Sequence, residues 1–420
     1  MIVGFIVENF LSIKNRQELS MVATMDKDME TSHCIVLETA AGLKLLKAAA
    51  VYGANASGKS NLIKAILYMR DFILTSTSAE KIPDSTAFQP FKLDIASLKK
   101  PGLFELKFLL DEKIYVYGFK IDKKKILSEW LYYYPGKNKA LLFKRDLVES
   151  KELKLSGNGK TGEINYSYKF GGYFKGEKRK IISLTRSNAL YLTVGAQFAH
   201  PVLEKVYQWF NHFLKPGIIP GSKEEDDLTT KLMESEGGIK KRIINFLKSA
   251  DLGIEDIKID KIHRERNSGE TSDIKMIHRA VSKDDEILAP IDFDDESLGT
   301  RRMYQLAGPL FHTLIYGGVL IIDELEDSLH IHMLKTLLRE FFEHSNQAQI
   351  IFTTHNVQLL EEKLFRRDEI WFTEKSEDGA SELFSLADFK PKPRKDKSLI
   401  NGYLNGAFGA LPLIGDLLSE

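Results

Sequence analysis

A glycine-rich stretch between an apolar run and a helical pattern constrains the fold of this chain most strongly. The stretch GANASGKS, residues 53–60, fits the pattern G-x-x-x-x-G-K-[ST]. Residues 45–52 form an apolar run typical of a buried strand, and apolar residues recur at helical spacing after the stretch. In such a loop, successive backbone N–H groups surround phosphate oxygens and the helix N-terminus faces them. The sequence therefore predicts a strand–loop–helix phosphate site within an α/β fold.

The residue types at the end of this loop predict nucleotide contacts. Lys59 is expected to reach the β- and γ-phosphates of ATP, and the Ser60 hydroxyl is expected to take one position around Mg²⁺. The alternative is a glycine-rich turn without a ligand, but the strand before it and the helix after it favour the phosphate loop. The nucleotide-contacting residues predicted here are Gly53, Ala54, Asn55, Ala56, Ser57, Gly58, Lys59, Ser60 and Asn61.

A second candidate site lies at the end of another apolar run. Residues 319–322 are apolar, and Asp323 and Glu324 follow them directly. Ligands bind at the carboxyl ends of strands in open α/β sheets, so we expect Asp323 to hold Mg²⁺ through a water and Glu324 to polarise the attacking water. Acidic residues also mark ordinary strand ends. Their pairing with the phosphate loop favours the functional interpretation.

Two further short patterns extend the same site. His355 follows the apolar run of residues 350–353, at the end of the predicted strand. A neutral imidazole there would contact the γ-phosphate; a structural histidine is the alternative. Ser297, Gly299 and Thr300 stand just before a helical pattern. Their hydroxyl groups, backbone amides and helix dipole are expected to bind a γ-phosphate, whereas the simpler interpretation is an N-cap serine.

The order of these patterns predicts four regions. Residues 1–190 are expected to form an N-terminal ATPase lobe with the phosphate loop and a β-meander over residues 103–134. Residues 191–290 are expected to form a helical and mixed insert, with helices marked by the apolar residues at 202–213 and 239–247 and exposed loops at 222–229 and 264–273. Residues 291–375 are expected to form a C-terminal ATPase lobe, followed by a tail at residues 376–420.

Composition narrows the class of protein. The 420 residues carry 59 basic and 59 acidic side chains, so bulk charge does not hold the chain to nucleic acid, although a local basic groove would. A single cysteine, Cys34, excludes a cysteine zinc cluster and an internal disulfide. No apolar stretch approaches the roughly 18 residues of a membrane span, so a cytoplasmic protein without a membrane contact is expected.

Taken in order, the four patterns resemble the ABC-type ATPase fold shared by SMC, Rad50 and OLD-family proteins, over about residues 1–372. This resemblance implies a P-loop head with a mixed, mainly parallel sheet, an antiparallel β subdomain and a short helical insert. It implies that Lys59 and Ser60 belong to the Walker A site, Asp323 and Glu324 to Walker B, and residues 326–330 to the D-loop. It also implies that His355 is the switch histidine, that residues 297–300 are the signature, and that two protomers enclose two ATP molecules. Leu298 and Thr300 replace a glycine and a glutamine of the usual signature, and Gln89 is a Q-loop candidate that the sequence does not fix.

A finer likeness involves the bacterial AAA-like ATP-binding proteins. The corresponding segments are residues 4–13, 52–61, 323–330, 352–356, 368–375 and 403–412. This group resembles RloA-type and abortive-infection ATPases and relatives of the PARIS anti-phage ATPase. The resemblance implies a homodimer or higher oligomer that works in defence with a separately encoded toprim-like or RloB-type effector.

Several functions remain open from the sequence. A nucleotide-dependent switch that controls an effector is the leading hypothesis; a repair-type ATPase of the SMC and Rad50 kind that clamps DNA, and a slowly hydrolysing structural protein, are the alternatives. The acidic cluster Asp292, Asp294 and Asp295 is interpreted as a solvated loop rather than a nuclease centre. The basic run at residues 390–397 is interpreted as a solvated segment, with a contact to nucleic acid or a partner as the alternative.

Overall fold

The fold is taken from a computed structural model of the full chain. The structure describes residues 1–37, 42–78, 85–148, 165–217, 224–234, 238–249, 253–262, 271–282, 285–327, 329–360, 364–389 and 399–410. The basic run at residues 390–397 and the end of the tail lie outside the described residues.

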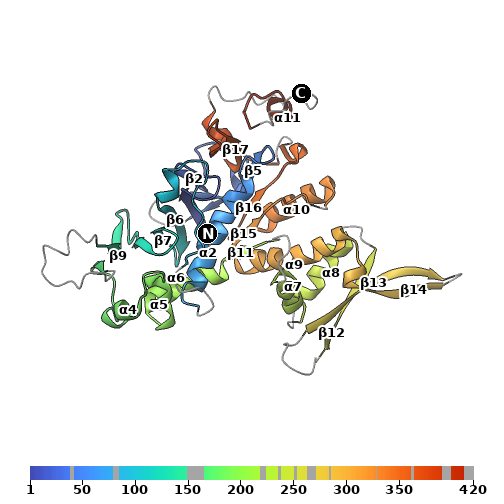
Figure 1. Ribbon diagram of the computed structural model, residues 1–420. Helices are drawn as coiled ribbons and strands as arrows, with labels where there is room; N and C mark the ends of the chain where they lie inside the picture. The colour runs from blue at the N-terminus through green and yellow to red at the C-terminus, as the bar shows by residue number, and fades with distance from the viewer. Residues whose placement is uncertain are drawn as a thin grey trace, which may run out of the picture.

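A six-stranded mixed sheet forms the centre of the molecule (Figure 1). Its strands, in spatial order, are β11 (Leu214–Pro216), β15 (Gly318–Ile322), β16 (Ala348–Thr353), β5 (Ala48–Gly53), β17 (Ile370–Lys375) and β18 (Ser381–Ser385). All neighbouring pairs are parallel except β17 and β18, which form an antiparallel hairpin. Strands β5, β15 and β16 are buried along their whole length, which explains why they read as continuous apolar runs in the sequence.

Helices connect the parallel strands, as a parallel sheet requires. Helix α2 (Lys59–Thr75) follows β5, α9 (Leu298–Tyr316) precedes β15, and α10 (Ile331–His344) joins β15 to β16. In α10 the buried residues Leu334, Leu337, Leu338 and Phe341 recur at helical spacing, so one face packs into the core.

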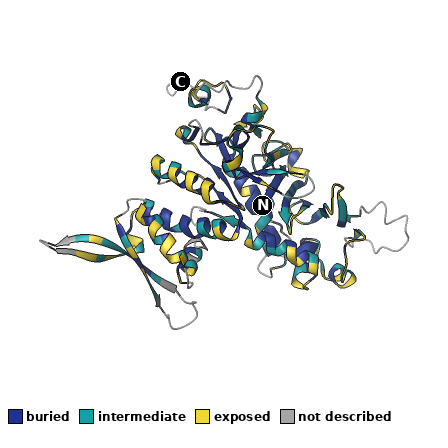
Figure 2. Cartoon of the chain, turned by 180° about the vertical axis from the view of Figure 1, so that it is seen from behind, coloured by how far each residue is buried: buried dark blue, intermediate teal, exposed yellow. Residues whose placement is uncertain are grey.

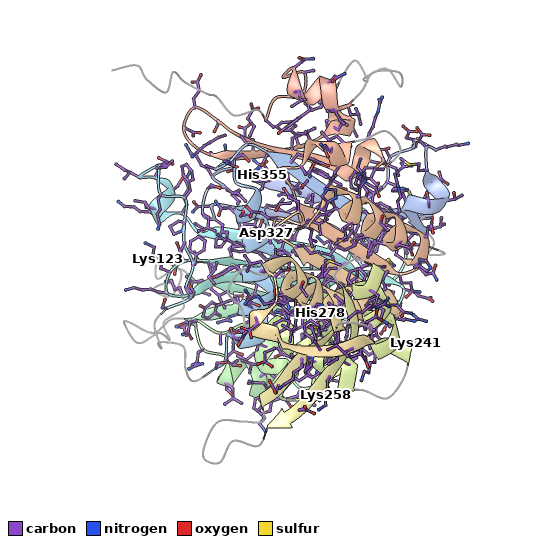
Figure 3. All side chains as sticks on the ribbon, turned by 90° about the vertical axis from the view of Figure 1, so that its right-hand side faces the viewer. Lys123, Lys241, Lys258, His278, Asp327 and His355 are labelled. Carbon is purple, nitrogen blue, oxygen red and sulfur yellow. The ribbon has the colours of Figure 1, made fainter. Side chains whose placement is uncertain are left out.

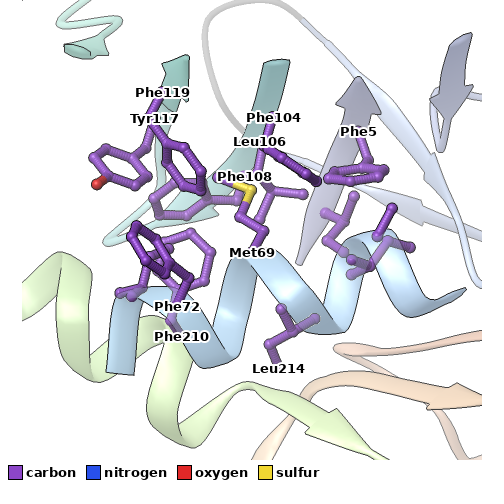
Figure 4. Packing of buried hydrophobic residues seen from close by; sticks show 14 of the residues in the cluster. Phe5, Met69, Phe72, Phe104, Leu106, Phe108, Tyr117, Phe119, Phe210 and Leu214 are labelled. Atoms are coloured by element: carbon purple, nitrogen blue, oxygen red, sulfur yellow. The ribbon is translucent and has the colours of Figure 1, made fainter. Parts of the chain in front are cut away.

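A seven-stranded antiparallel sheet lies beside the central sheet. Its spatial order is β10 (Tyr166–Phe170), β9 (Ala140–Leu147), β8 (Ile126–Tyr133), β7 (Lys113–Ile121), β6 (Gly102–Leu110), β1 (Ile2–Glu8) and β2 (Gln17–Ser20). The predicted meander over residues 103–134 corresponds to β6, β7 and β8. The side chains on one face of this sheet pack against α2 and α6 (Figure 4), among them Phe5, Phe104, Phe108 and Phe119.

A third group of elements extends from the body of the molecule. Helices α7 (Glu224–Glu234) and α8 (Gly238–Ser249) pack with α9, and the sheet of β12 (Ile254–Ile262), β13 (Thr271–Ser282) and β14 (Asp285–Asp292) projects beyond them (Figure 1). Figure 2 shows that this projecting sheet carries more exposed residues than the central sheet. Two loop predictions were wrong over the residues that the structure describes: residues 224–229 lie in α7, and residues 271–273 lie in β13. The rest of the two predicted loops, residues 222–223 and 264–270, lies outside the described residues.

The remaining elements are short. They are α1 (Glu30–His33), β3 (Cys34–Val36), β4 (Lys44–Leu46), α4 (Arg179–Leu184), α5 (Tyr191–Gln197), α6 (Pro201–His212) and α11 (Leu399–Leu404), with 3₁₀ turns at Ser97–Lys99, Phe293–Asp295, Val357–Leu360, Arg367–Glu369 and Leu386–Asp388. The two buried strand systems and the helices between them give an α/β fold with a mixed sheet core and an antiparallel β subdomain. Among the described residues, no helix has the length and apolar character needed to cross a membrane.

Candidate functional site

The predicted site residues converge because three neighbouring strands end at the same edge of the central sheet. Strands β15, β16 and β5 are adjacent and parallel, with Ile322 opposite Phe352 and Thr353 opposite Val51. Asp323, the segment that follows Thr353 and the glycine-rich loop therefore leave the sheet side by side. This is the edge where ligands bind in parallel α/β folds.

The loop itself is tightly curved. Ala56 has a φ of 62° and Gly58 a φ of 110°, and α2 begins at Lys59. A Cβ atom added to Gly58 would lie 2.0 Å from the Ser381 Oγ, so glycine is required there by both backbone conformation and space. The first N–H groups of α2 have no acceptor within the helix, and Gly58 at the N-cap brings no side chain to cap them. The loop therefore presents a set of amide donors suited to phosphate oxygens.

Lys59 lies within this loop and close to His355. Its Nζ donates to the carbonyl oxygens of Gly53 at 2.9 Å and Ala54 at 3.0 Å, and lies 3.3 Å from the His355 Nδ1. Burial lowers the pKa of Lys59, while the carboxylates of Glu324, Glu326 and Asp323 act in the opposite direction. Burial and then the Lys59 ammonium lower the pKa of His355, so the imidazole is held neutral and its Nδ1 accepts.

The acidic strand end is ordered by a threonine from the neighbouring strand. The Thr353 hydroxyl donates to the Asp323 carboxylate at 2.6 Å and accepts the Glu324 N–H at 2.8 Å. Glu324 has a φ of 54° and an exposed side chain, so its carboxylate faces solvent at the edge of the sheet. Glu326 accepts the N–H of His355 through Oε1, while its buried Oε2 has no partner among the described residues.

The signature segment forms a separate part of the surface. Ser297 is the N-cap of α9; its Oγ accepts the Thr300 N–H at 3.1 Å and lies 2.9 Å from the Thr300 Oγ1. Leu298 is 68% exposed, and Ser297 is also exposed. Within the described part of the chain, no hydrogen bond joins Ser297 or Gly299 to the glycine-rich loop. The structure thus brings Lys59, Asp323, Glu324 and His355 together and leaves the signature apart from them.

Helix α9 still contacts the acidic strand end. Arg302, which is 7% exposed, donates from Nη2 to the Asp323 carbonyl at 3.5 Å and lies 3.9 Å from the Asp327 carboxylate. On the other side of the signature, His278 Nε2 lies 2.5 Å from Glu296 Oε1. In the view of Figure 3, the Asp327 label stands between those of His278 and His355. Helix α9 connects the signature segment to the acidic strand end through Arg302.

The donor set fits Mg²⁺ bound together with a phosphate. Ser60 is the second residue of α2 and supplies a hydroxyl group, and Asp323 supplies a carboxylate at the end of a nearby strand of the same sheet. Among the described residues, no group of three or more His, Cys, Asp or Glu side chains is arranged to hold a metal on its own. Mg²⁺ usually takes one or two protein oxygens with phosphate oxygens and waters, so this sparse set of oxygen donors is suitable.

The structure also places the residues whose roles were left open. Asp292, Asp294 and Asp295 are exposed, and Asp292 lies 3.5 Å from the Lys275 ammonium. Gln89 is exposed, and its carbonyl oxygen accepts the Leu11 N–H. Sequence reasoning missed Ser12, Arg302, Thr373 and Ser381, all of which contact the loop, the α2 start or the acidic strand end.

The fold and this site define a P-loop ATPase domain. A family model described as "AAA domain, putative AbiEii toxin, Type IV TA system" matches residues 48–361, which is most of the chain, and the chain belongs to this family. No curated protein sequence matches it.

Three solved structures are similar to the chain. The SMC head domain from Thermotoga maritima is 12% identical, with 91% of this chain and 98% of that chain covered and a TM-score of 0.39. An SMC head bound to the C-terminal winged-helix domain of ScpA is 14% identical, with 91% and 97% covered and a TM-score of 0.42. The Pyrococcus furiosus SMC head with an extended coiled coil, bound to the C-terminal domain of ScpA, is 14% identical, with 91% and 96% covered and a TM-score of 0.42.

Proposed function

We propose that the protein binds and hydrolyses ATP with Mg²⁺ to give ADP and phosphate. The observation that carries this proposal is the convergence of Lys59, His355, Asp323 and Glu324 at the carboxyl edge of three adjacent parallel strands. Residues 53–61 would surround the phosphates with backbone N–H groups, and Ser60 and Asp323 would hold Mg²⁺. When bound there, Mg²⁺ neutralises phosphate charge and orients the γ-phosphoryl group.

The side chains then have distinct tasks. The exposed Glu324 carboxylate accepts a proton from the attacking water as the water oxygen bonds to the γ-phosphorus and the bond to the ADP oxygen breaks. Neutral His355 donates through the ring nitrogen that does not face Lys59, so it can hydrogen-bond a γ-phosphate oxygen. Thr353 keeps the Asp323 carboxylate and the Glu324 backbone in place through its two hydrogen bonds.

The exposed signature supports a nucleotide-dependent homodimer. Ser297, Gly299 and Thr300 form the N-terminus of α9, Ser297 is exposed, and a second protomer would place this segment against each bound ATP. ATP would bind this closed pair better than the open one, and hydrolysis would release the pair. The nucleotide cycle thus becomes a switch.

The biological role that this switch supports best is control of an effector in an anti-phage, toxin–antitoxin-like system. The family description names a toxin of a type IV toxin–antitoxin system, which supports a second component. The effector in this proposal is separately encoded and nuclease-like, of toprim or RloB type.

A DNA-handling ATPase of the SMC and Rad50 kind is the second candidate. Its support is a basic cluster on α8, formed by Lys240, Lys241 and Arg242, which are exposed and make no ion pair within the described residues. Helix α8 packs against α9, so this cluster lies on the helix pair that carries the signature. Strongly salt-dependent binding of duplex DNA that ATP stimulates would favour this candidate over effector control.

The proposal is tested by Glu324→Gln, measured for ATP turnover, ATP binding and mass in solution. We expect turnover to fall by about 10²-fold or more, because general-base catalysis contributes that much, while ATP binding persists and an ATP-bound dimer accumulates. Lys59→Ala should lose binding itself. Glu343→Gln, on the exposed face of α10, makes the same charge change away from the site and should turn over normally. Normal turnover by Glu324→Gln would contradict the assignment, and absence of ATP binding by the unmodified protein would contradict the function.

A further inference from the structure

The glycine-rich loop is fastened by hydroxyl groups that come from both ends of the chain. The Ser57 Oγ lies 2.6 Å from the Thr373 Oγ1 in β17. The Ser57 carbonyl accepts a hydrogen bond of 2.6 Å from the Ser381 hydroxyl in β18. The Ser381 Oγ lies 2.7 Å from the Ser12 Oγ, which accepts from the Asn61 amide at 2.7 Å.

The number of protons on each group shows which hydroxyl donates in the contact between Ser57 and Thr373. A hydroxyl group carries one proton, and a carbonyl oxygen only accepts. Thr373 donates to the Tyr52 carbonyl at 3.3 Å, so Ser57 is the donor between Ser57 and Thr373. This chain of hydroxyl groups therefore ends on the last carbonyl before Gly53.

A second set of contacts centres on Ser381. Its hydroxyl donates toward the Ser57 carbonyl and toward the Ser12 Oγ, and the Asn61 amide donates to the same Ser12 Oγ. Because a carbonyl oxygen only accepts, the Ser57 carbonyl depends on Ser381 for this hydrogen bond. We call this set of contacts the serine relay.

The serine relay fixes the orientation of one peptide group in the loop. The peptide that joins Ser57 to Gly58 is planar and trans, so its N–H points away from its carbonyl oxygen. Because Ser381 holds that oxygen on the side of β18, the Gly58 N–H faces the other side of the loop. Among the described residues, this N–H donates no hydrogen bond to a backbone acceptor outside regular helices and strands.

We propose that Ser381 is a positioning residue for phosphate binding, which it serves by orienting the Gly58 N–H toward the β-phosphate of the bound nucleotide. This inference rests on the proposed function and deepens it. Ser12, Thr373 and Ser381 all lie outside residues 48–361, the range that the family model matches. The hydroxyl groups that hold the loop thus come from the N-terminal segment and from the β17–β18 hairpin.

Burial makes the Ser381 contact hard to replace. Ser57 and Ser381 are 3% and 4% exposed, so water cannot readily take the place of a deleted hydroxyl. Without it, the Ser57 carbonyl would be left buried and unsatisfied, and the peptide would turn toward another donor. The loop would then lose one of its phosphate-facing N–H groups while the strands around it stay paired.

The test is Ser381→Ala, with Ser385→Ala as the matched control. Ser385 is also buried in β18 and also donates to a backbone carbonyl, that of Ile370, but it does not contact the loop. The affinities for ADP and for AMP are measured by calorimetry in the presence of Mg²⁺. We expect Ser381→Ala to weaken ADP binding about tenfold, the effect of one lost charge-assisted hydrogen bond, and to leave AMP binding unchanged. Ser385→Ala should leave the affinity for both nucleotides unchanged.

Ser12→Ala supplies a second variant at a half-buried position, so the test does not depend on the folding of Ser381→Ala. Ser12 contacts both Ser381 and the Asn61 amide, so we expect a loss of ADP affinity of about threefold or less, and a smaller additional loss when Ser12→Ala is added to Ser381→Ala than when it is made alone. Equal losses in Ser381→Ala and Ser385→Ala would overturn the proposal and assign the effect to hairpin stability. Unchanged ADP affinity in a folded Ser381→Ala protein would overturn it as well. Failure of the unmodified protein to bind any nucleotide would instead refute the proposed function on which it rests.

Discussion

The loop side and the signature side of the site are built in opposite ways. The loop side, residues 53–60, is held by hydrogen bonds from β17, β18 and the turn after β1, and Lys59 already lies beside His355. The signature side is the N-terminus of α9, whose first residues, Ser297 and Leu298, are exposed. The loop side is thus held within one chain, whereas the start of the signature side is open to solvent.

This difference suggests how binding and switching are divided. A preformed loop binds phosphate without an ordering cost, so the first contact with the nucleotide belongs to one chain. In the proposed homodimer, the exposed N-terminus of α9 would contribute only when a second protomer approaches it. Closure would then depend on the nucleotide and on protein concentration, while initial binding would depend on neither a partner nor an effector.

Gly58→Ala should distort the glycine-rich loop, and we expect it to cause the largest loss of nucleotide affinity. The added methyl group would lie 2.0 Å from the Ser381 Oγ at a positive φ, so the loop must shift, and we expect nucleotide affinity to fall by about 10²-fold or more. Gly136→Ala is the control, because a Cβ there meets nothing within 4 Å. Calorimetry with ADP measures both. Retained affinity in Gly58→Ala would show that the loop is less rigidly held than these contacts imply.

Mixing two inactive variants tests the signature side. Lys59→Ala disables one loop, and Ser297→Arg blocks one signature, so each protein alone should have little turnover. In an equal mixture half of the dimers are mixed, and each mixed dimer keeps one intact composite site, so about a quarter of the normal turnover should return. ATP turnover of the mixture and of each variant alone provides the measurement. Dimers that form without any recovery would contradict a site shared between protomers.

The half-buried His312 near the C-terminal end of α9 gives the smallest expected effect, which is a change in how stability depends on pH. Burial, followed by the charges of Lys215 and His212, lowers the pKa of His312 to about 4. The unfolded chain therefore takes up this proton first, and the stabilisation present above pH 6.5 is lost as pH falls toward 4. Between pH 7.5 and 5 the free energy of unfolding should fall by about 1 kcal/mol less in His312→Gln than in the unmodified protein. The difference is this small because His312 is partly exposed, which weakens the contribution of its pKa shift. His332→Gln, at an exposed position, should leave that loss unchanged.

The sequence predicted the parts of the site that are coded locally. A strand, a glycine-rich loop and a helix occur within about 30 residues, and the acidic pair and His355 each follow an apolar run, so each part carries its own pattern. Parallel pairing then brings the strand ends together. The meander at residues 103–134 was predictable for the same reason, since its alternation has period two.

The sequence did not reveal the residues that support the site from a distance. Ser381 contacts Ser57 across 324 residues, and Thr373 contacts Ser57 across 316, and small hydroxyl side chains of this kind follow no periodic pattern. Arg302 also gave no signal, because an arginine on a helix usually faces solvent. Polar residues at 224–229 and 271–273 were interpreted as loops because the burial of one face of each element depends on its neighbours.

The position of β5 in the central sheet has a consequence for synthesis. This strand is completed by residue 53, yet its neighbours β16 and β17 begin at residues 348 and 370. The ribosome therefore has to release nearly the whole chain before β5 can pair with β16 or β17. Contacts so distant in sequence also favour slow folding. We expect a nascent chain that stops before β16 to leave β5 unpaired and to bind no nucleotide. An incomplete copy of the protein would therefore stay out of the proposed nucleotide cycle.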